Sequence, residues 1–222
     1  QAGTGGGSGS YAFKQSIIIG DSALNSTGSN DVIGQIAIGY EALTSLTSGD
    51  WNTAIGTSAG KFATGADNSI FIGYQAGQGI DGTKLTGDDN TVIGYQSGLL
   101  LQGAASDNTL VGSSAGDAIT TGSGNTVLGA QAGSALTTNS SNTIVGYNAL
   151  PSADLGEEGN VVVGIDAGYS INNSSADNNV LIGRQSGMGG TGALQQCVSI
   201  GAFAMDATGT NAQTGTIAIG YN

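Results

Sequence analysis

The sequence predicts an all-β fold, a parallel β-roll or β-helix solenoid of about twelve short coils. Three observations predict it: a short apolar run that ends in Gly recurs along the chain, β-branched and aliphatic residues precede each Gly, and polar turn-forming residues separate the runs. Such self-similarity at a short period is typical of solenoids, in which each repeat is one coil. The twelve register Gly residues, spaced 17 to 21 positions apart, are Gly20, Gly39, Gly56, Gly73, Gly94, Gly112, Gly129, Gly146, Gly164, Gly183, Gly201 and Gly220.

Each expected strand occupies the three residues before a register Gly, and positions are counted from that Gly. Position −1 is always a large aliphatic residue and position −3 is always β-branched, as in Thr126 and Leu128 before Gly129. Residues two apart lie on the same face of a strand, so positions −3 and −1 are expected to fill the core. The predicted core ladder at position −1 consists of Ile55, Ile72, Ile93, Val111, Leu128, Val145, Val163 and Ile182.

Position −2 faces the other way and is also mostly apolar. A strand that is apolar on both faces is buried on both, and a contiguous exposed stripe exceeds what a soluble monomer tolerates. A single chain with so few residues per coil has only one interior, so we expect chains to associate along their length through position −2. The predicted inter-chain stripe consists of Phe71, Val92, Leu110, Val127, Ile144, Val162 and Leu181.

The second half of each coil begins after the register Gly. Position +3 is Ala or Ser and position +4 is mostly Gly, which predicts close backbone packing opposite the large −1 residue. The remaining residues are rich in Ser, Thr, Gly, Asn and Asp and are expected to form turns. The longest such segment, residues 78–89, is the expected decoration of the coils. Residues 1–15 are predicted to be a Gly/Ser-rich linker, and residues 16–222 one repeat domain.

Asn recurs at position −4 in seven coils, where stacked amides are expected to form a ladder at a corner of the coil. The alternative is calcium at the Asp-Asn corners, because oxygen ligands suit this cation; the candidates are Asp89, Asn90, Asp107 and Asn108. The Gly-Gly-x-Gly-x-Asp signature of calcium-binding rolls is absent, and no other cofactor is expected. Cys197 takes the place of Asn in one coil and is expected to be a small buried hydrophobe.

The composition argues against several functions. The net charge is −12 and only four residues are Lys or Arg, so nucleic-acid binding is not expected. No apolar run approaches the roughly 18 residues of a membrane span, so membrane insertion is not expected. The chain has no His, which excludes His-based catalysis. The adjacent acidic pairs Glu157-Glu158 and Asp88-Asp89 are expected in solvated loops, where they cannot face one bond. We expect no enzymatic activity.

Two recurring residue types leave binding alternatives open. Tyr occurs at position +1 in five coils, including Tyr74 and Tyr95; packing over the Gly gap explains it, but exposed aromatic rings also stack on sugars. Thr occurs at position −3 in five coils, including Thr126 and Thr143. This column resembles the regular Thr arrays of ice-binding solenoids, although the expected inward orientation favours buried packing.

The segments Asn68–Gly77 and Asn90–Gly98 resemble repeats of tailed-phage tail-fibre proteins, which often precede an intramolecular chaperone domain of the endosialidase type. They are also similar to the head repeats of trimeric autotransporter adhesins. The resemblance covers residues 16–222 and implies a left-handed parallel β-roll in which three chains wind around one axis, with no catalytic residues. The repeats here are longer than those of the adhesin heads, which favours the phage-type fibre.

The resemblance implies a structural fibre segment of a virion that spaces or presents host-receptor binding. Its expected partners are two further copies in a homotrimer, other fibre or tail proteins, and a glycan or protein of the host surface. One alternative is an adhesin head that binds extracellular matrix or glycan, and another is a self-polymerising extracellular filament. The expected location is therefore the virion, or the extracellular space and cell surface.

Overall fold

A computed structural model describes residues 13–25, 31–189, 193–206, 209 and 211–221. These residues form an all-β parallel solenoid of about 11 turns, with no helix among them. By its internal contacts the chain divides into two compact units, residues 1–108 and 109–222, and each unit is described by itself. Of the predicted linker, residues 1–15, the first twelve lie outside the described residues. Within its last three residues, Phe13–Lys14 forms the short strand β1.

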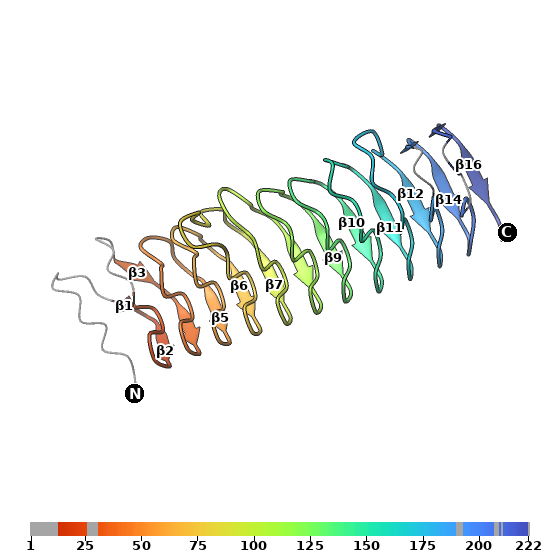
Figure 1. Ribbon diagram of the computed structural model, residues 1–222. Coiled ribbons are helices and arrows are strands. Elements are labelled where there is room, and N and C mark those ends of the chain that lie inside the picture. Colours follow the sequence, from red (N-terminus) through yellow and green to blue (C-terminus); the bar gives the residue numbers. More distant parts are fainter. Residues whose placement is uncertain (1–12, 26–30, 190–192, 207–208, 210, 222) are drawn as a thin grey trace. The chain divides into compact units, whose positions relative to one another are not determined.

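The strands occur where the Gly register predicts them, and within each unit they run in the same direction (Figure 1). Neighbouring strands pair in parallel and in register, so that equal positions of successive coils lie side by side. In the first unit these strands are β2 (Ile17–Ile19), β4 (Ile36–Ile38), β5 (Thr53–Ile55), β6 (Ile70–Ile72) and β7 (Thr91–Ile93). In the second unit they are β8 (Thr109–Val111), β9 (Thr126–Leu128), β10 (Thr143–Val145), β11 (Val161–Val163), β12 (Val180–Ile182), β14 (Val198–Ile200) and β16 (Ile217–Ile219).

Two pairs of short strands lie outside this ladder. In the first unit β1 pairs in parallel with β3 (Val32–Ile33). In the second unit β13 (Leu194–Gln195) pairs in parallel with β15 (Gln213–Thr214). Each of these short strands precedes a strand of the main ladder by only a few residues. The coils that contain them therefore pair with each other through a second, shorter sheet.

The interior of each coil is lined by position −2, which corrects the predicted orientation of the strands. In β6 to β12 the side chains at this position have no exposed surface within the single chain. The returning half of the coil covers them: in the coil of Leu110, an added Cβ at Gly116 would lie 3.1 Å from Cδ2 of Leu110 and 2.8 Å from Cδ1 of Ile119. No part of these side chains is left for contact with another chain, so the prediction of an inter-chain stripe is wrong for Phe71, Val92, Leu110, Val127, Ile144, Val162 and Leu181.

Positions −3 and −1 point outward, because side chains alternate along a strand and position −2 points inward. The prediction of a core ladder at position −1 is therefore also wrong. Leu128 is 49% exposed, Ile182 37% and Ile55 36%. The other members of the predicted ladder are partly exposed: Ile72, Ile93, Val111, Val145 and Val163.

The register Gly is required at the end of each strand by its backbone and by the next coil. Gly129 has a φ of 140°, which residues with a side chain rarely adopt. A Cβ atom at this position would lie 2.3 Å from the carbonyl oxygen of Gly146 in the following coil. The same close approach recurs from Gly146 to Gly164, so only Gly permits both the turn and the spacing of the coils.

Positions −2 and +4 have complementary sizes in the coils of Ala37 and Phe71. The chain there is in the left-handed region, with a φ of 51° at Leu43 and 54° at Gly77. The coil with the small Ala37 at position −2 has the buried Leu43 at position +4. The coil with the large Phe71 has Gly77 instead, and a Cβ there would lie 2.2 Å from Cδ1 of Phe71. The small residue at position +4 thus packs against position −2. The sequence-based prediction that it packs opposite position −1 is wrong.

Candidate interaction surfaces

The outward face of the sheet carries an uncharged array of β-branched and aliphatic side chains in each unit. In the second unit the −3 column runs from Thr109 to Thr126 to Thr143, which are register partners in neighbouring strands and are all exposed. Beside them, Val111, Leu128 and Val145 form the −1 column. The first unit carries the equivalent array, from Ile17 and Ile19 of β2 to Thr91 and Ile93 of β7. No Asp, Glu, Lys or Arg occurs at either position in any strand.

The outward orientation of the Thr column reverses the sequence-based expectation that these residues are buried. Thr109, Thr126 and Thr143 are exposed, and Thr53 and Thr91 are partly exposed. A parallel sheet normally has both faces covered. Here one face is covered by the coil itself and the other is open in the single chain.

Tyr side chains at position +1 are exposed beside the strand ends. Tyr74 is 47% and Tyr95 53% exposed, and their rings stack with centroids 5.5 Å apart and planes 12° from parallel. Each ring therefore covers part of its neighbour. The Tyr residues of the register are accordingly available to solvent, which leaves the predicted alternative of sugar stacking open.

A buried amide ladder follows position −4, as predicted. In the second unit Asn142 donates from Nδ2 to Oδ1 of Asn125 at 3.3 Å, and Asn160 and Asn179 continue the series at 3.2 and 2.9 Å. The backbone amide of Cys197 then donates to Oδ1 of Asn179 at 2.9 Å. Cys197 is completely buried at the end of this series, so the prediction of a small buried side chain is confirmed.

The calcium candidates do not converge on one point. Asn90 and Asn108 are buried in the amide ladder, where Nδ2 of Asn108 donates to Oδ1 of Asn90 at 3.1 Å. Asp89 and Asp107 directly precede them, are exposed, and have left-handed backbones. The two residue types therefore point to opposite sides of the coil wall. Among the described residues no group of three or more Asp, Glu, His or Cys side chains is arranged to hold a metal ion.

One member of each acidic pair, Asp88 and Glu157, accepts hydrogen bonds within the protein. Oδ1 of Asp88 accepts the backbone amide of Asp67 at 2.8 Å, and Asp67 in turn accepts that of Asp50 at 2.6 Å. Glu157 is completely buried, which makes the expectation of a solvated loop wrong for this residue. Its partner in sequence, Glu158, is exposed as predicted.

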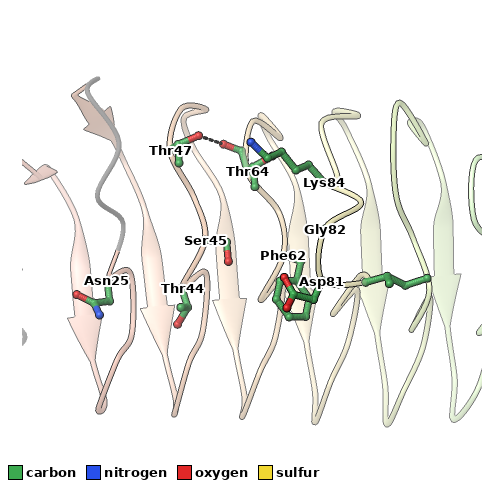
Figure 2. A pocket seen from close by; sticks show the side chains of 10 residues that line it. Asn25, Thr44, Ser45, Thr47, Phe62, Thr64, Asp81, Gly82 and Lys84 are labelled. Atoms are coloured by element: carbon green, nitrogen blue, oxygen red, sulfur yellow. Dashed lines mark hydrogen bonds between the residues drawn. The ribbon is translucent and has the colours of Figure 1, made fainter.

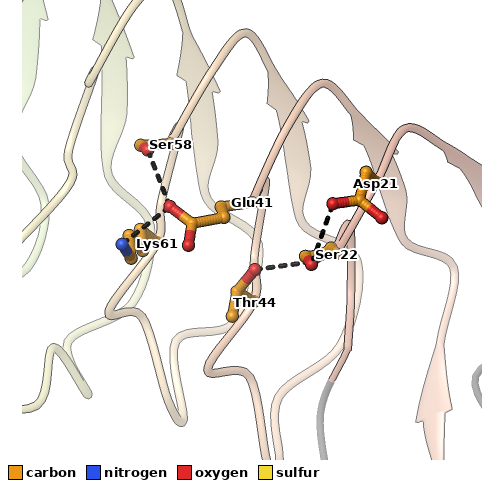
Figure 3. Close-up of polar contacts among 6 residues, drawn as sticks. All are labelled: Asp21, Ser22, Glu41, Thr44, Ser58 and Lys61. Carbon is orange, nitrogen blue, oxygen red and sulfur yellow. Dashed lines mark hydrogen bonds and ion pairs between the residues drawn. The ribbon is translucent and has the colours of Figure 1, made fainter.

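A second polar column follows position +2 in the first unit (Figure 3). Oε2 of Glu41 contacts Nζ of Lys61 at 2.7 Å and the hydroxyl of Ser58 at 3.4 Å. The hydroxyl of Thr44 donates to the carbonyl oxygen of Ser22 at 2.5 Å. These contacts join successive coils. The charges of Glu41 and Lys61 are thus paired with each other within the protein.

Asp117 in the second unit is a partly buried carboxyl group. Its Oδ1 atom is buried and has no hydrogen-bond partner among the described residues. Burial raises the pKa of Asp117 above its ordinary value of 3.8, and hydrogen bonds from the side chain of Ser114 and from backbone amides oppose this shift only in part.

A groove of about 360 Å³ lies on the loop side of the first unit (Figure 2). One wall is the 78–89 loop, which the chain folds into a tight turn in which the backbone amide of Thr83 donates to the carbonyl oxygen of Ile80 at 3.2 Å. The opposite wall consists of residues that follow position +4 in the preceding coils. The lining residues are Asn25, Thr44, Ser45, Thr47, Phe62, Thr64, Ile80, Asp81, Gly82 and Lys84.

The sequence predicts the loop of this groove but not the side chains that line it. The signal for the loop was the spacing of 21 residues between Gly73 and Gly94, the longest of the register. Phe62, Asp81 and Lys84 lie in segments without periodicity, so nothing in the pattern singled them out.

Comparison with protein-family models, with curated proteins and with solved structures yields no match. In the described part of the chain no helix is long and apolar enough to span a bilayer.

Proposed function

We propose that the chain is a structural fibre segment of a virion, of the phage tail-fibre type, that spaces or presents host-receptor binding and assembles as a homotrimer. The observation that carries this proposal is the open, uncharged face formed by positions −3 and −1. Parallel sheets are normally covered on both faces, and an apolar patch of this regularity marks an interaction site. A second copy of the chain offers the same array along its whole length, so equal chains match coil by coil.

The repeated structure favours a fibre over an enzyme. The coils repeat the same three-residue strand and register Gly, and stacked repeats of this kind provide length and a regular surface. The alternatives of an adhesin head and of a self-polymerising filament use the same coils. An adhesin head differs by binding extracellular matrix or glycan itself, and a filament differs by growing without a fixed mass.

The mass of the native particle in solution, measured by light scattering, tests this proposal. We expect three chains per particle. Leu128→Asp places a charge on the outward face, and we expect it to reduce the mass to that of one chain, because an unpaired charge in an apolar contact is costly. Leu155→Asp is the matched control, because Leu155 is similarly exposed, at 54% against 49% for Leu128, but lies in a loop away from the strands.

Three outcomes test the assembly. A trimer that L128D dissociates and L155D does not supports the trimeric assembly, which the fibre and the adhesin head share. Particles of unlimited length would favour the filament. A monomeric wild type overturns the trimer and leaves the exposed Thr column facing water, which favours the ice-binding alternative; thermal hysteresis of the monomer then measures that activity.

A further inference from the structure

We propose that the groove beside the 78–89 loop binds a neutral saccharide, with the ring of Phe62 as a stacking platform and with Asp81 and Lys84 as polar contacts. This proposal deepens the proposed function, because a fibre that presents receptor binding requires a site for a host-surface ligand. The groove belongs to one coil and its neighbours in the first unit, so it does not repeat along the chain as the outward face does.

The groove is made by an insertion that has no structural counterpart in the other coils. Most coils span 17 to 19 residues, whereas the coil between Gly73 and Gly94 spans 21. The extra residues form the turn from Ile80 to Thr83, in which Asp81, Gly82 and Thr83 are all exposed. A turn that projects from a regular wall leaves an open groove against it, and the groove volume of about 360 Å³ is within the range of small-ligand sites.

The hydroxyl groups on the opposite wall are held in one orientation. Thr44 donates its hydroxyl hydrogen to the carbonyl oxygen of Ser22 at 2.5 Å, and Thr47 donates to that of Thr64 at 3.0 Å (Figure 2). A hydroxyl that has donated its hydrogen keeps lone pairs that accept. Thr44 and Thr47 therefore present fixed acceptors to the groove.

The turn supplies the remaining polar groups. Lys84 is exposed and has three N–H donors, and Asp81 is exposed and accepts only. Neither side chain forms an ion pair or a hydrogen bond with another described residue. In the view of Figure 2, Lys84 points toward Thr64. The groove is thus lined by a donor, Lys84, and by acceptors at Asp81, Thr44 and Thr47.

This combination matches a sugar better than an ion. Each sugar hydroxyl both donates and accepts, so a site that offers donors and acceptors can satisfy it. The C–H face of a pyranose ring packs on an aromatic ring, and Phe62 is the partly exposed aromatic residue of the groove. The charges of Asp81 and Lys84 have opposite signs and favour a neutral ligand. The chain's net charge of −12 further disfavours anions.

Saturation-transfer NMR on the native particle tests the site, with the methyl glycosides of glucose, galactose, mannose and N-acetylglucosamine as probes. We expect transfer to the ring protons of at least one glycoside. Phe62→Leu keeps apolar volume but removes the aromatic face, and Asp81→Asn changes an exposed side chain without affecting the fold. Each is expected to weaken binding about tenfold or more, as the loss of one charged hydrogen bond or stacking contact does.

Tyr95→Ala is the matched control, because it removes an exposed aromatic ring outside the groove and should leave binding unchanged. The proposal is overturned if none of the four glycosides receives transfer, if binding survives in both F62L and D81N, or if only Y95A abolishes it. Binding of the zwitterion glycine in place of every glycoside would also overturn it, since Asp81 and Lys84 would then recognise separate charges. Light scattering of the same variants reports assembly independently, so failure of this site and failure of the trimer are distinguishable.

Discussion

Nδ2 of Asn139 donates to Oε2 of Glu157 at 2.8 Å, and both side chains are completely buried. The same carboxylate accepts the backbone amide of Leu155 at 3.0 Å through Oε2 and that of Asn173 at 2.7 Å through Oε1. One buried charge therefore joins the loops of three successive coils. A buried carboxylate is tolerated only where such donors replace the water it has lost.

Glu157→Gln is expected to destabilise the protein by about 1–3 kcal/mol. The amide nitrogen of Gln is a donor, so it would face at least one of the three N–H groups that now point at the carboxylate. The midpoint of urea unfolding measures the effect. Glu158→Gln, at an exposed side chain, is the control and should change stability by no more than about 0.5 kcal/mol. Equal midpoints for E157Q and E158Q would contradict this role of Glu157.

The volume exchange between positions −2 and +4 predicts a rescue. Phe71→Ala should cost about 3–5 kcal/mol, because it leaves a cavity in the coil. Gly77→Leu alone should also be destabilising, since its Cβ would lie 2.2 Å from Cδ1 of Phe71. The double variant F71A/G77L reproduces the arrangement of Ala37 and Leu43. We expect it to regain about 1–2 kcal/mol relative to F71A, as coupled neighbours do.

Thermal unfolding of the two single variants and the double variant measures this coupling. Gly82→Leu is the control for backbone strain, because Gly82 has a φ of 85° and no atom within 4 Å of an added Cβ. Strictly additive losses in F71A and G77L would show that the two positions do not share one volume.

Much of the fold was predictable from the sequence because the repeat fixes where each strand ends. The Gly register, the strand positions, the amide ladder and the buried Cys197 all follow from residue types that only one local environment accepts. The face that each strand buries was not predictable from hydrophobicity, since positions −3, −2 and −1 are all largely apolar. The decisive signal was parity: Asn125 at position −4 is two residues from Val127, so a buried amide ladder requires position −2 to point inward as well.

The groove was less predictable than the fold. Its lining comes from four different coils, and whether Phe62, Asp81 and Thr47 line one groove depends on how those coils stack. Loop residues carry no periodicity, so the sequence located the insertion but not the side chains that it brings together. Glu157 was missed for the same reason: an acidic residue in a polar loop has the composition of a solvated segment, and only the stacking of three coils encloses it.

Asp117 predicts a pH dependence of stability in the acid range. Because burial raises its pKa in the folded protein above 3.8, the folded state holds the proton more tightly than the unfolded chain. Its contribution to stability is therefore fully present below pH 3.8 and is lost as the pH rises through the raised pKa. Asp117→Asn removes this loss, so we expect D117N to be more stable than the wild type at pH 7, by no more than about 1 kcal/mol because the carboxyl is only partly buried.

Thermal midpoints of D117N and of the wild type, compared between about pH 3 and pH 7, measure this difference. The two curves should meet below pH 3.8, where the wild-type carboxyl is protonated in both states, and separate as the pH rises. Asp154→Asn changes an exposed carboxyl in a loop and should follow the wild type throughout. Parallel curves for D117N and the wild type would mean that the carboxyl of Asp117 is hydrated in the folded protein, because only the loss of water around it makes its charged form unfavourable.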